Sequence, residues 1–243
     1  MIYAILFLFG LAIGSFLYVI ASRYRKEGIG GRSHCPQCGK ILAWHELVPL
    51  ASFLIQRGKC RHCAHRLSWR YPASEILAGL ILTLIPWQFG FSTESALWIL
   101  ALLILLLIAF IDLRLSIIPD GLNVSLGLIG VRFLAVHGYN NAIGFGVGAL
   151  IFGLIIAATK GKGMGMGDLK LAAVLGLIFG WPKILLIIMA AFLVGGIWAA
   201  GVLLLKHKSL KDAIPFGPFL AIASAFVLFF GDVIMNWLGY VSR

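Results

Sequence analysis

The stretch "ALIFGLIIAATKGKGMGMGDLKLAAVLGLIFG", residues 149–180, joins two apolar runs through a segment of alternating glycines. One carboxylate, Asp168, stands at the end of that segment, and the apolar run after it reaches only to Gly180. A helix of about 12 residues is ~18 Å long, which is short of the ~30 Å hydrocarbon core of a membrane. We therefore expect Asp168 to lie partly inside the membrane, where irregular backbone survives only if it lines a cavity or is buried in protein.

The composition around this stretch is that of a chain with several membrane spans. Of the 243 residues, 61% are hydrophobic and 12% are charged, and the mean hydropathy is +1.00. Soluble domains are about 45–50% apolar and about 25% charged. We predict an all-α polytopic membrane protein with about eight transmembrane helices, at 2–22, 72–89, 95–111, 122–136, 143–159, 169–180, 184–205 and 216–238. The short sixth segment leaves open a six- or seven-span arrangement with one re-entrant element.

The basic residues predict the orientation of these helices. If both termini lie outside, 17 of the 20 Lys and Arg residues fall at the cytoplasmic side, in or beside the loops at 23–71, 112–121, 160–168 and 206–215. Cytoplasmic loops carry such an excess of basic residues. The net charge of +11 then reflects topology and contact with anionic lipids, and it requires no nucleic-acid partner. The first span is followed, not preceded, by its basic residues, which predicts an uncleaved helix over 1–22.

One long polar insertion, residues 23–71, separates the first two spans and contains every cysteine of the chain. The cysteines form two Cys-x-x-Cys pairs, "CPQC" and "CRHC", whose members are Cys35, Cys38, Cys60 and Cys63. Two such pairs suit a tetrahedral zinc site, and four thiolates leave no position for a catalytic water. We expect a structural zinc ion that folds the cytoplasmic insertion; a pair of reactive dithiols is the alternative. The nearby histidines are expected to be solvated or to lie outside the ligand shell.

Four of the nine acidic residues lie where a carboxylate needs an explanation. Asp112 ends the third predicted span, and a charge at such an edge is a functional candidate by default. For Asp120, an N-cap of the fourth span is the simplest interpretation. For Glu75, the simplest is a favourable interaction with the dipole of the second span, whose first turn it would occupy. Asp168 is either part of a glycine hinge or helix cap, or a functional acid.

Asp112 and Asp168 together suggest one chemistry. If the third and sixth spans pack together, the two carboxyl groups share a proton, because like charges at close range do not both ionise. One carboxylate then acts as the base that activates a water molecule against a peptide carbonyl. The other acts as the acid that protonates the developing oxyanion and the leaving amine. The glycines beside Asp168 would let an extended substrate strand pass the pair.

These residues resemble those of a known family. "GMGD" at 165–168, after the aspartate of "IDLRLSIIPD", resembles the GxGD aspartyl proteases. Together with "GSFLYV", "CPQC…CRHC" and "RYPASE", it is similar to the prepilin peptidases, also called type IV leader peptidases. The resemblance runs from Gly14 to about Lys170, and later only "PFGPFLA" at 215–221 agrees in detail.

The resemblance implies an inner-membrane protease that removes the short basic leader from type IV prepilins and pseudopilins at the cytoplasmic face. Many members then methylate the new N-terminus with S-adenosylmethionine. It implies that Asp112 and Asp168 are catalytic, that the four cysteines bind zinc, and that 72–243 is the protease core. We expect substrate binding to be supported by Gly165, Gly167, Lys170, Asp120 and Glu75. Tyr18 stands where the family usually has Asn, so a peptidase without methyltransferase activity is an alternative.

Two other classes of function compete with this interpretation. A proton- or ion-coupled transporter would use the same aspartates, but the sequence shows neither the inverted repeats typical of that class nor a reason for the cysteine insertion. A zinc scaffold without enzymatic activity would not need either aspartate. Two glycine pairs, Gly10 with Gly14 and Gly144 with Gly148, predict close helix–helix contacts. Nothing in the sequence defines an oligomeric state.

Overall fold

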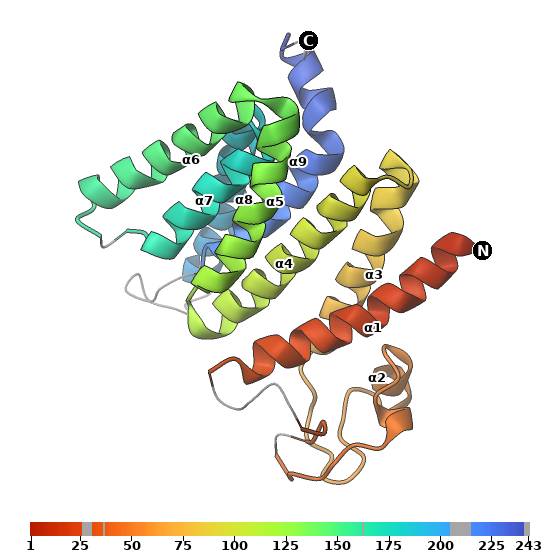
Figure 1. The fold of residues 1–243 in the computed structure, drawn as a ribbon. Coiled ribbons are helices and arrows are strands. Elements are labelled where there is room, and N and C mark those ends of the chain that lie inside the picture. Colours follow the sequence, from red (N-terminus) through yellow and green to blue (C-terminus); the bar gives the residue numbers. More distant parts are fainter. Residues whose placement is uncertain (26–30, 36, 162, 205–214, 241–243) are drawn as a thin grey trace. The chain divides into compact units, whose positions relative to one another are not determined.

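The computed structural model describes residues 1–25, 31–35, 37–161, 163–204 and 215–240 (Figure 1). Each predicted span corresponds to a helix, and the insertion adds a 3-10 turn and one short helix. The elements are α1 (Ile2–Arg23), η1 (Trp44–Glu46), α2 (Ala51–Ile55), α3 (Arg70–Phe89), α4 (Thr93–Leu115), α5 (Asp120–His137), α6 (Tyr139–Ala158), α7 (Met166–Phe179), α8 (Lys183–Leu204) and α9 (Gly217–Trp237). Only two isolated β-bridges occur among the described residues, which confirms the all-α prediction.

Within the part of the chain that the structure describes, six helices are long and apolar enough to cross a membrane. They are α1, α3, α4, α6, α8 and α9. The remaining two of the eight predicted segments, α5 and α7, are shorter, at 18 and 14 residues. At ~1.5 Å per residue α7 is about 21 Å long. The prediction of a short helix here is therefore confirmed, while eight is an approximate number of full spans. The helix begins earlier than predicted, at Met166, so Asp168 lies in its first turn and not on irregular backbone before it.

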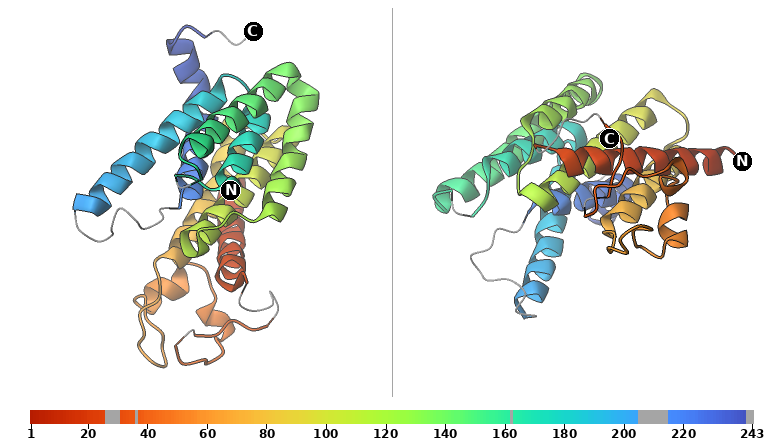
Figure 2. Two further views of the ribbon diagram at one scale, coloured as in Figure 1. Left: turned by 90° about the vertical axis from the view of Figure 1, so that its left-hand side faces the viewer. Right: turned by 90° about the horizontal axis from the view of Figure 1, so that it is seen from below.

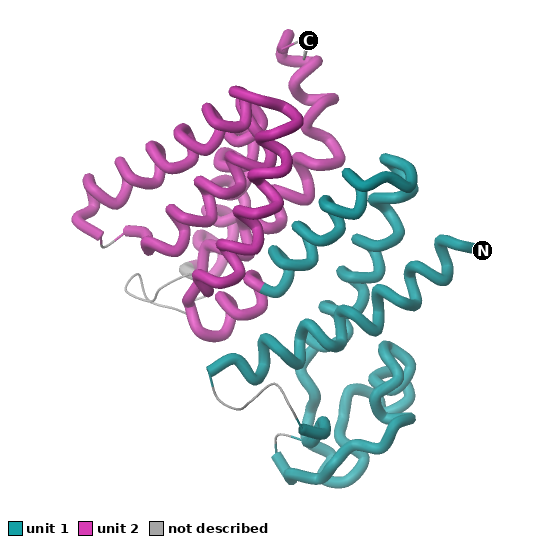
Figure 3. Tube along the Cα trace, in the orientation of Figure 1, with its two compact units in different colours: residues 1–107 teal, residues 108–243 magenta. Residues whose placement is uncertain are grey.

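The chain divides into two compact units, Met1–Leu107 and Ile108–Arg243 (Figure 3). In the first unit, α1 and α3 pack along each other over much of their length (Figure 1). A β-carbon at Gly10 would lie 2.6 Å from the Cα of Gly79, and one at Gly14 would lie 2.7 Å from the Cα of Glu75. The predicted contact at this glycine pair is confirmed, because only hydrogen side chains allow the two backbones to approach so closely.

In the second unit, α7 contacts α5, α6, α8 and α9 (Figure 2). The other predicted glycine pair lies in its closest interface, against α6. β-carbons at Gly144 and Gly148 would overlap the carbonyl oxygens of Gly176 and Ala172. Half of the residues of α7 are buried, although the helix is short. Neighbouring helices therefore enclose the element that begins beside Asp168.

The C-terminal end of α7 is fixed by a side chain from α6. The amide Nδ2 of Asn141 donates hydrogen bonds to the carbonyl oxygens of Leu177, at 2.8 Å, and Ile178, at 3.2 Å. These are orphan carbonyls of a helix end, which need partners away from water. Gly180, at φ +71°, ends the helix in a left-handed conformation. With one end anchored, the length of α7 sets the position of its first turn.

The contact between α6 and α7 gives a stability prediction. Gly176→Ala places a methyl group against the backbone of Gly144 and is expected to cost at least about 1–3 kcal/mol, as overpacking does. Thermal unfolding in detergent measures the loss as a lower Tm. Gly146→Ala, on α6, is the matched control, because a β-carbon there meets no atom within 4 Å. Equal Tm values for the two variants would contradict the close approach.

Candidate active site and metal centre

Asp112 lies near the C-terminal end of α4, with 4% of its surface exposed. Its Oδ2 accepts a hydrogen bond from the backbone N–H of Gly217 at 2.8 Å. Gly217 is the first residue of α9, so the carboxylate also lies at the positive end of that helix dipole. A buried carboxylate requires such partners, and here a helix that begins 105 residues further along the chain supplies one.

Asp168 lies in the first turn of α7 and is half-buried. Its Oδ2 accepts a hydrogen bond from the N–H of Gly165 at 3.2 Å, which forms a capping interaction with the residue that precedes the helix. The helix-cap interpretation of Asp168 therefore holds in part. It is compatible with a catalytic role, because the bond occupies one carboxylate oxygen and orients the group.

The structure brings the chain around the two aspartates together. Asp168 lies near enough to Asp112 to act on its charge electrostatically. Ile118, in the segment after α4, packs against the first turn of α7, where a β-carbon at Gly167 would lie 3.1 Å from the Cβ of Ile118. Both carboxylates are held by backbone N–H groups at helix N-termini, one at α9 and one at α7. Such an arrangement suits a pair of acids that exchange protons with a substrate.

Asp120 and Lys170 join α5 to α7 beside this pair. Their side chains form an ion pair, with 2.7 Å between Lys170 Nζ and Asp120 Oδ1, and both are largely exposed. The N-cap interpretation of Asp120 is wrong, because Pro119 occupies the cap position and no side chain caps the helix. Exposed ion pairs contribute about 0–1 kcal/mol. The pair therefore orients two side chains next to Asp168 more than it stabilises the fold.

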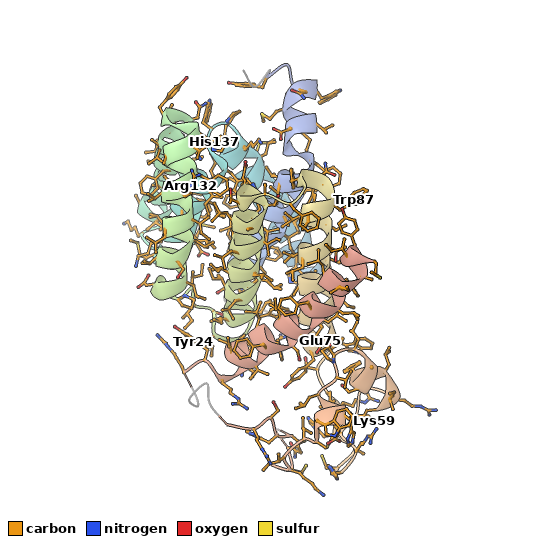
Figure 4. All side chains as sticks on the ribbon, turned by 45° about the vertical axis from the view of Figure 1, so that its right-hand side comes forward. Tyr24, Lys59, Glu75, Trp87, Arg132 and His137 are labelled. Carbon is orange, nitrogen blue, oxygen red and sulfur yellow. The ribbon has the colours of Figure 1, made fainter. Side chains whose placement is uncertain are left out.

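Glu75 connects the cysteine insertion to the helices of the first unit. Its Oε2 accepts a hydrogen bond from the N–H of Leu50 at 2.8 Å, and the Ser15 side chain of α1 also hydrogen-bonds to it. Figure 4 places Glu75 at the end of α3 nearest the insertion. The helix-dipole interpretation is wrong, because α3 begins at Arg70 and Glu75 lies beyond its first turn. The carboxylate instead binds the segment that follows η1.

The two Cys-x-x-Cys pairs adopt the same turn. In the first, Cys35 N–H donates to Lys40 O and Gly39 N–H donates to Cys35 O. In the second, Cys60 and Ala64 make the equivalent bonds. Gly39 and Ala64 both have positive φ, at 68° and 55°. The β-bridges His34↔Ile41 and Lys59↔Arg66 close the two turns. Each pair is thus a knuckle that presents two sulfur atoms.

The four sulfur atoms fit a tetrahedral metal ion, since all of them lie within 4.8 Å of one another. A zinc ion with bonds of about 2.3 Å separates its sulfur ligands by about 3.8 Å, and the Sγ atoms of Cys35 and Cys63 are 3.8 Å apart. Burial raises the pKa of Cys35, but hydrogen bonds from the backbone of Cys38 and Gln37 and from neighbouring thiols lower it to about 7. A backbone hydrogen bond from His65 lowers the pKa of Cys63, but burial and the neighbouring thiols raise it to about 12. Metal ligation requires thiolates, so a bound divalent cation would favour the ionised form of all four cysteines.

Comparison with known proteins assigns both halves of the chain. Residues 8–89 match the bacterial peptidase A24 N-terminal domain, and residues 99–200 match the type IV leader peptidase family. A prepilin leader peptidase/N-methyltransferase of Bacillus subtilis is 32% identical over 96% of this chain and 96% of its own length. The chain belongs to the type IV leader peptidase family. Proteins of the same name from Aeromonas salmonicida and Legionella pneumophila are 34% and 33% identical, over 97% and 98% of this chain and 93% and 95% of their own lengths. No solved structure matches.

This leader peptidase is a multi-pass protein of the inner membrane. Sequence reasoning singled out the two aspartates and the four cysteines. The structure brings the four sulfur atoms together and places Asp168 within electrostatic range of Asp112. Sequence reasoning missed the hydrogen bonds that Gly217 and Leu50 donate to buried carboxylates. The motif "PFGPFLA" contains Gly217 and was the only available signal, because a glycine between two prolines at a helix start indicates a close approach.

Proposed function

We propose that Asp112 and Asp168 are the catalytic pair of a membrane aspartyl endopeptidase that removes the leader from type IV prepilins and pseudopilins. The observation that carries the proposal is the placement of the two carboxylates. Each comes from a different helix, each is bound by a backbone N–H at a helix N-terminus, and each lies within electrostatic range of the other. The names of the relatives favour this function over a transporter or a zinc scaffold.

The chemistry follows from two neighbouring acids with unequal environments. Asp112 is buried and bound to Gly217, while Asp168 is half-buried at the start of α7. Two carboxyl groups at close range retain one proton between them. The ionised group takes a proton from water as that water attacks the scissile carbonyl, and the protonated group donates to the oxyanion. Collapse of the tetrahedral intermediate then transfers a proton to the leaving amine.

The surroundings of Asp168 suit an extended substrate on the side of Gly165. Gly165 is exposed and has no side chain, so a peptide backbone can approach the carboxylate there, while Gly167 lets Ile118 pack against the first turn of α7 and supports the site from behind. The ion pair of Lys170 with Asp120 borders the same turn and offers a donor and an acceptor for the substrate. We keep Glu75 as a proposed support residue because it fixes the segment that ends at Leu50 within the first unit. The apolar segment of a prepilin would lie between helices, with its leader in the cytoplasm.

Methylation of the new N-terminus is the second part of the proposal. The relatives are named N-methyltransferases as well as leader peptidases. S-adenosylmethionine supplies an activated methyl group in such a reaction. A glycine-rich Rossmann turn follows a strand of a parallel sheet, and the described residues contain no parallel sheet. In this part of the chain S-adenosylmethionine would therefore bind by another kind of site. A peptidase without methyltransferase activity is the alternative, and the mass of the mature N-terminus distinguishes the two.

The cysteine insertion would hold a structural zinc ion in the cytoplasm. Four thiolates close its coordination shell, so zinc would fold the insertion and take no part in cleavage. Both termini then lie outside, and the basic insertion faces anionic lipids, where exposed Trp44 and Trp69 suit the membrane interface. We retain 1–22, 23–71 and 72–243 as the functional division into first helix, zinc-binding loop and protease core.

An in vitro assay tests the function directly. Purified protein in detergent is incubated with a synthetic prepilin that carries its leader and apolar segment, with and without S-adenosylmethionine. Mass spectrometry is expected to show a cleaved product in both reactions and one added methyl group only with the cofactor. An intact substrate in both reactions would overturn the peptidase proposal. Cleavage without any methylated product would leave the peptidase and remove the methyltransferase.

A further inference from the structure

We propose that Gly217 is a positioning residue of the protease, and that the N-terminus of α9 holds Asp112 in its working orientation. This inference rests on the proposed function of the two aspartates. It adds a third element, the segment at residues 215–219, to the catalytic arrangement formed by α4 and α7. Gly217 acts through Asp112 and not on the substrate.

The contact between Gly217 and Asp112 is specific to glycine. Besides the 2.8 Å hydrogen bond, the α-carbon of Gly217 faces the carboxylate so closely that no side chain fits between them. A β-carbon at Gly217 would lie 2.8 Å from Asp112 Oδ2, 3.3 Å from its Cγ and 3.4 Å from its Cβ. All three nearest atoms belong to the same aspartate. Any larger residue would therefore displace the carboxyl group itself.

The start of α9 is held in place by aromatic rings. The ring centroid of Phe216 lies 5.0 Å from that of Phe192 on α8, 6.0 Å from that of Phe152 on α6 and 6.1 Å from that of Phe219. Phe152 is fully buried, and Gly195 on α8 leaves room for the rings. These contacts fix the residue immediately before Gly217. A rigid cluster therefore determines where the N–H of Gly217 points.

This arrangement accounts for how a buried carboxylate on α4 is oriented. A catalytic group must be held within about 0.5 Å of its productive position by neighbours that are themselves fixed. The N–H of Gly217 supplies a directional bond, and the first turn of α9 supplies partial positive charge. Losing this support changes the geometry of the reacting acid but removes no contact with substrate. The expected signature is a lower kcat with an unchanged KM.

The test compares Gly217→Ala with Gly196→Ala. Gly196 lies on α8, where a β-carbon would meet no atom within 4 Å, so its variant should behave as wild type. Gly217→Ala is expected to lower kcat by about 10- to 100-fold, since misplacement by about 1 Å has effects of this size. Its KM should stay close to that of wild type, while its Tm falls somewhat because the new methyl group displaces a buried carboxyl group. A Gly217→Ala enzyme with wild-type kcat, or with an altered KM and normal kcat, would overturn the inference.

A second variant keeps the inference testable if Gly217→Ala is unstable. Phe192→Leu loosens the aromatic cluster without adding bulk near Asp112, and it should lower kcat by about 3- to 10-fold at constant KM, a partial loss of the same positioning. Where Gly217→Ala folds, the losses in the double variant should be less than multiplicative, because both substitutions act through one hydrogen bond. Fully multiplicative losses, or a Phe192→Leu enzyme with normal kcat, would argue against it. Wild type and Asp168→Asn are assayed together with these variants. An inactive wild type would overturn the proposed peptidase function, whereas an active wild type with an unaffected Gly217→Ala variant would overturn only the positioning role of Gly217.

Discussion

Asp112→Asn and Asp168→Asn are each expected to abolish leader cleavage, with kcat at least about 10³-fold below wild type. An amide is similar in shape to a carboxylate, but it neither accepts a proton from water nor donates one to the oxyanion. In the Asp112→Asn variant the new amide oxygen could still accept the N–H of Gly217, so the fold around α9 should persist. The measurement is the cleavage rate of a synthetic prepilin, followed by mass spectrometry, with Tm recorded for each variant.

Asp232→Asn is the matched control for these two substitutions. Asp232 forms an ion pair with Lys183 between α9 and α8, with 2.7 Å between the charged atoms, and it takes no part in the proposed chemistry. Its variant should cleave at the wild-type rate. Retention of more than about a tenth of wild-type kcat in either Asp112→Asn or Asp168→Asn would exclude proton transfer by that group, because such transfer contributes about 10²–10⁴-fold.

Loss of the metal from the cysteine insertion is expected to have the second large effect. Structural zinc contributes about 10–16 kcal/mol in small domains, so the insertion should not hold its fold without the ion. Cys35→Ser with Cys60→Ser removes one ligand from each knuckle and buries two weaker ligands instead. The zinc content should fall from about one per chain to near zero. Limited proteolysis should then cut within 23–71, while the helices remain intact in detergent.

His62→Ala is the control for the metal prediction. His62 lies between the two cysteines of the second knuckle, yet the four sulfurs already complete a tetrahedron. Its variant should retain full zinc content, as measured by elemental analysis of the purified protein. Wild-type protein that contains no metal and has two disulfide bonds under reducing purification would contradict the zinc site. Loss of zinc in His62→Ala would contradict the ligand set.

The helices could be predicted from the sequence because a membrane span is a continuous apolar run and a close helix contact is marked by two glycines four residues apart. The apolar runs located all of the long helices, and the spacing of Gly144 and Gly148 predicted a close contact that α7 provides. The apolar run after Asp168 is short and predicted a short helix, and the structure ends that helix at Phe179 with Gly180 as its C-cap. The paired cysteines predicted a metal-binding cluster for the same reason, because each knuckle is a local turn.

The hydrogen-bond and ion-pair partners of the carboxylates could not be predicted from local sequence. Leu50 lies 25 residues before Glu75, and Gly217 lies 105 residues after Asp112, and no periodicity relates either pair. Asp120 was interpreted as a cap because its local sequence favours one, whereas Lys170 from α7 is its actual partner. These errors share a cause. A carboxylate binds whichever donor the fold brings nearest, and local sequence describes only the donors next to it in the chain.

The anchoring of α7 by Asn141 has a consequence for how this chain can evolve. With its far end tied to α6, the helix works as a ruler, and adding or deleting one residue would shift its first turn by about 1.5 Å and rotate it by about 100°. Either change would turn Asp168 away from its partner. Length variation should therefore be tolerated in the connecting loops but selected against between Gly165 and Gly180. The number of residues in that segment sets how far Asp168 lies from the anchored end of the helix, and so where along the helix axis a substrate would be cleaved.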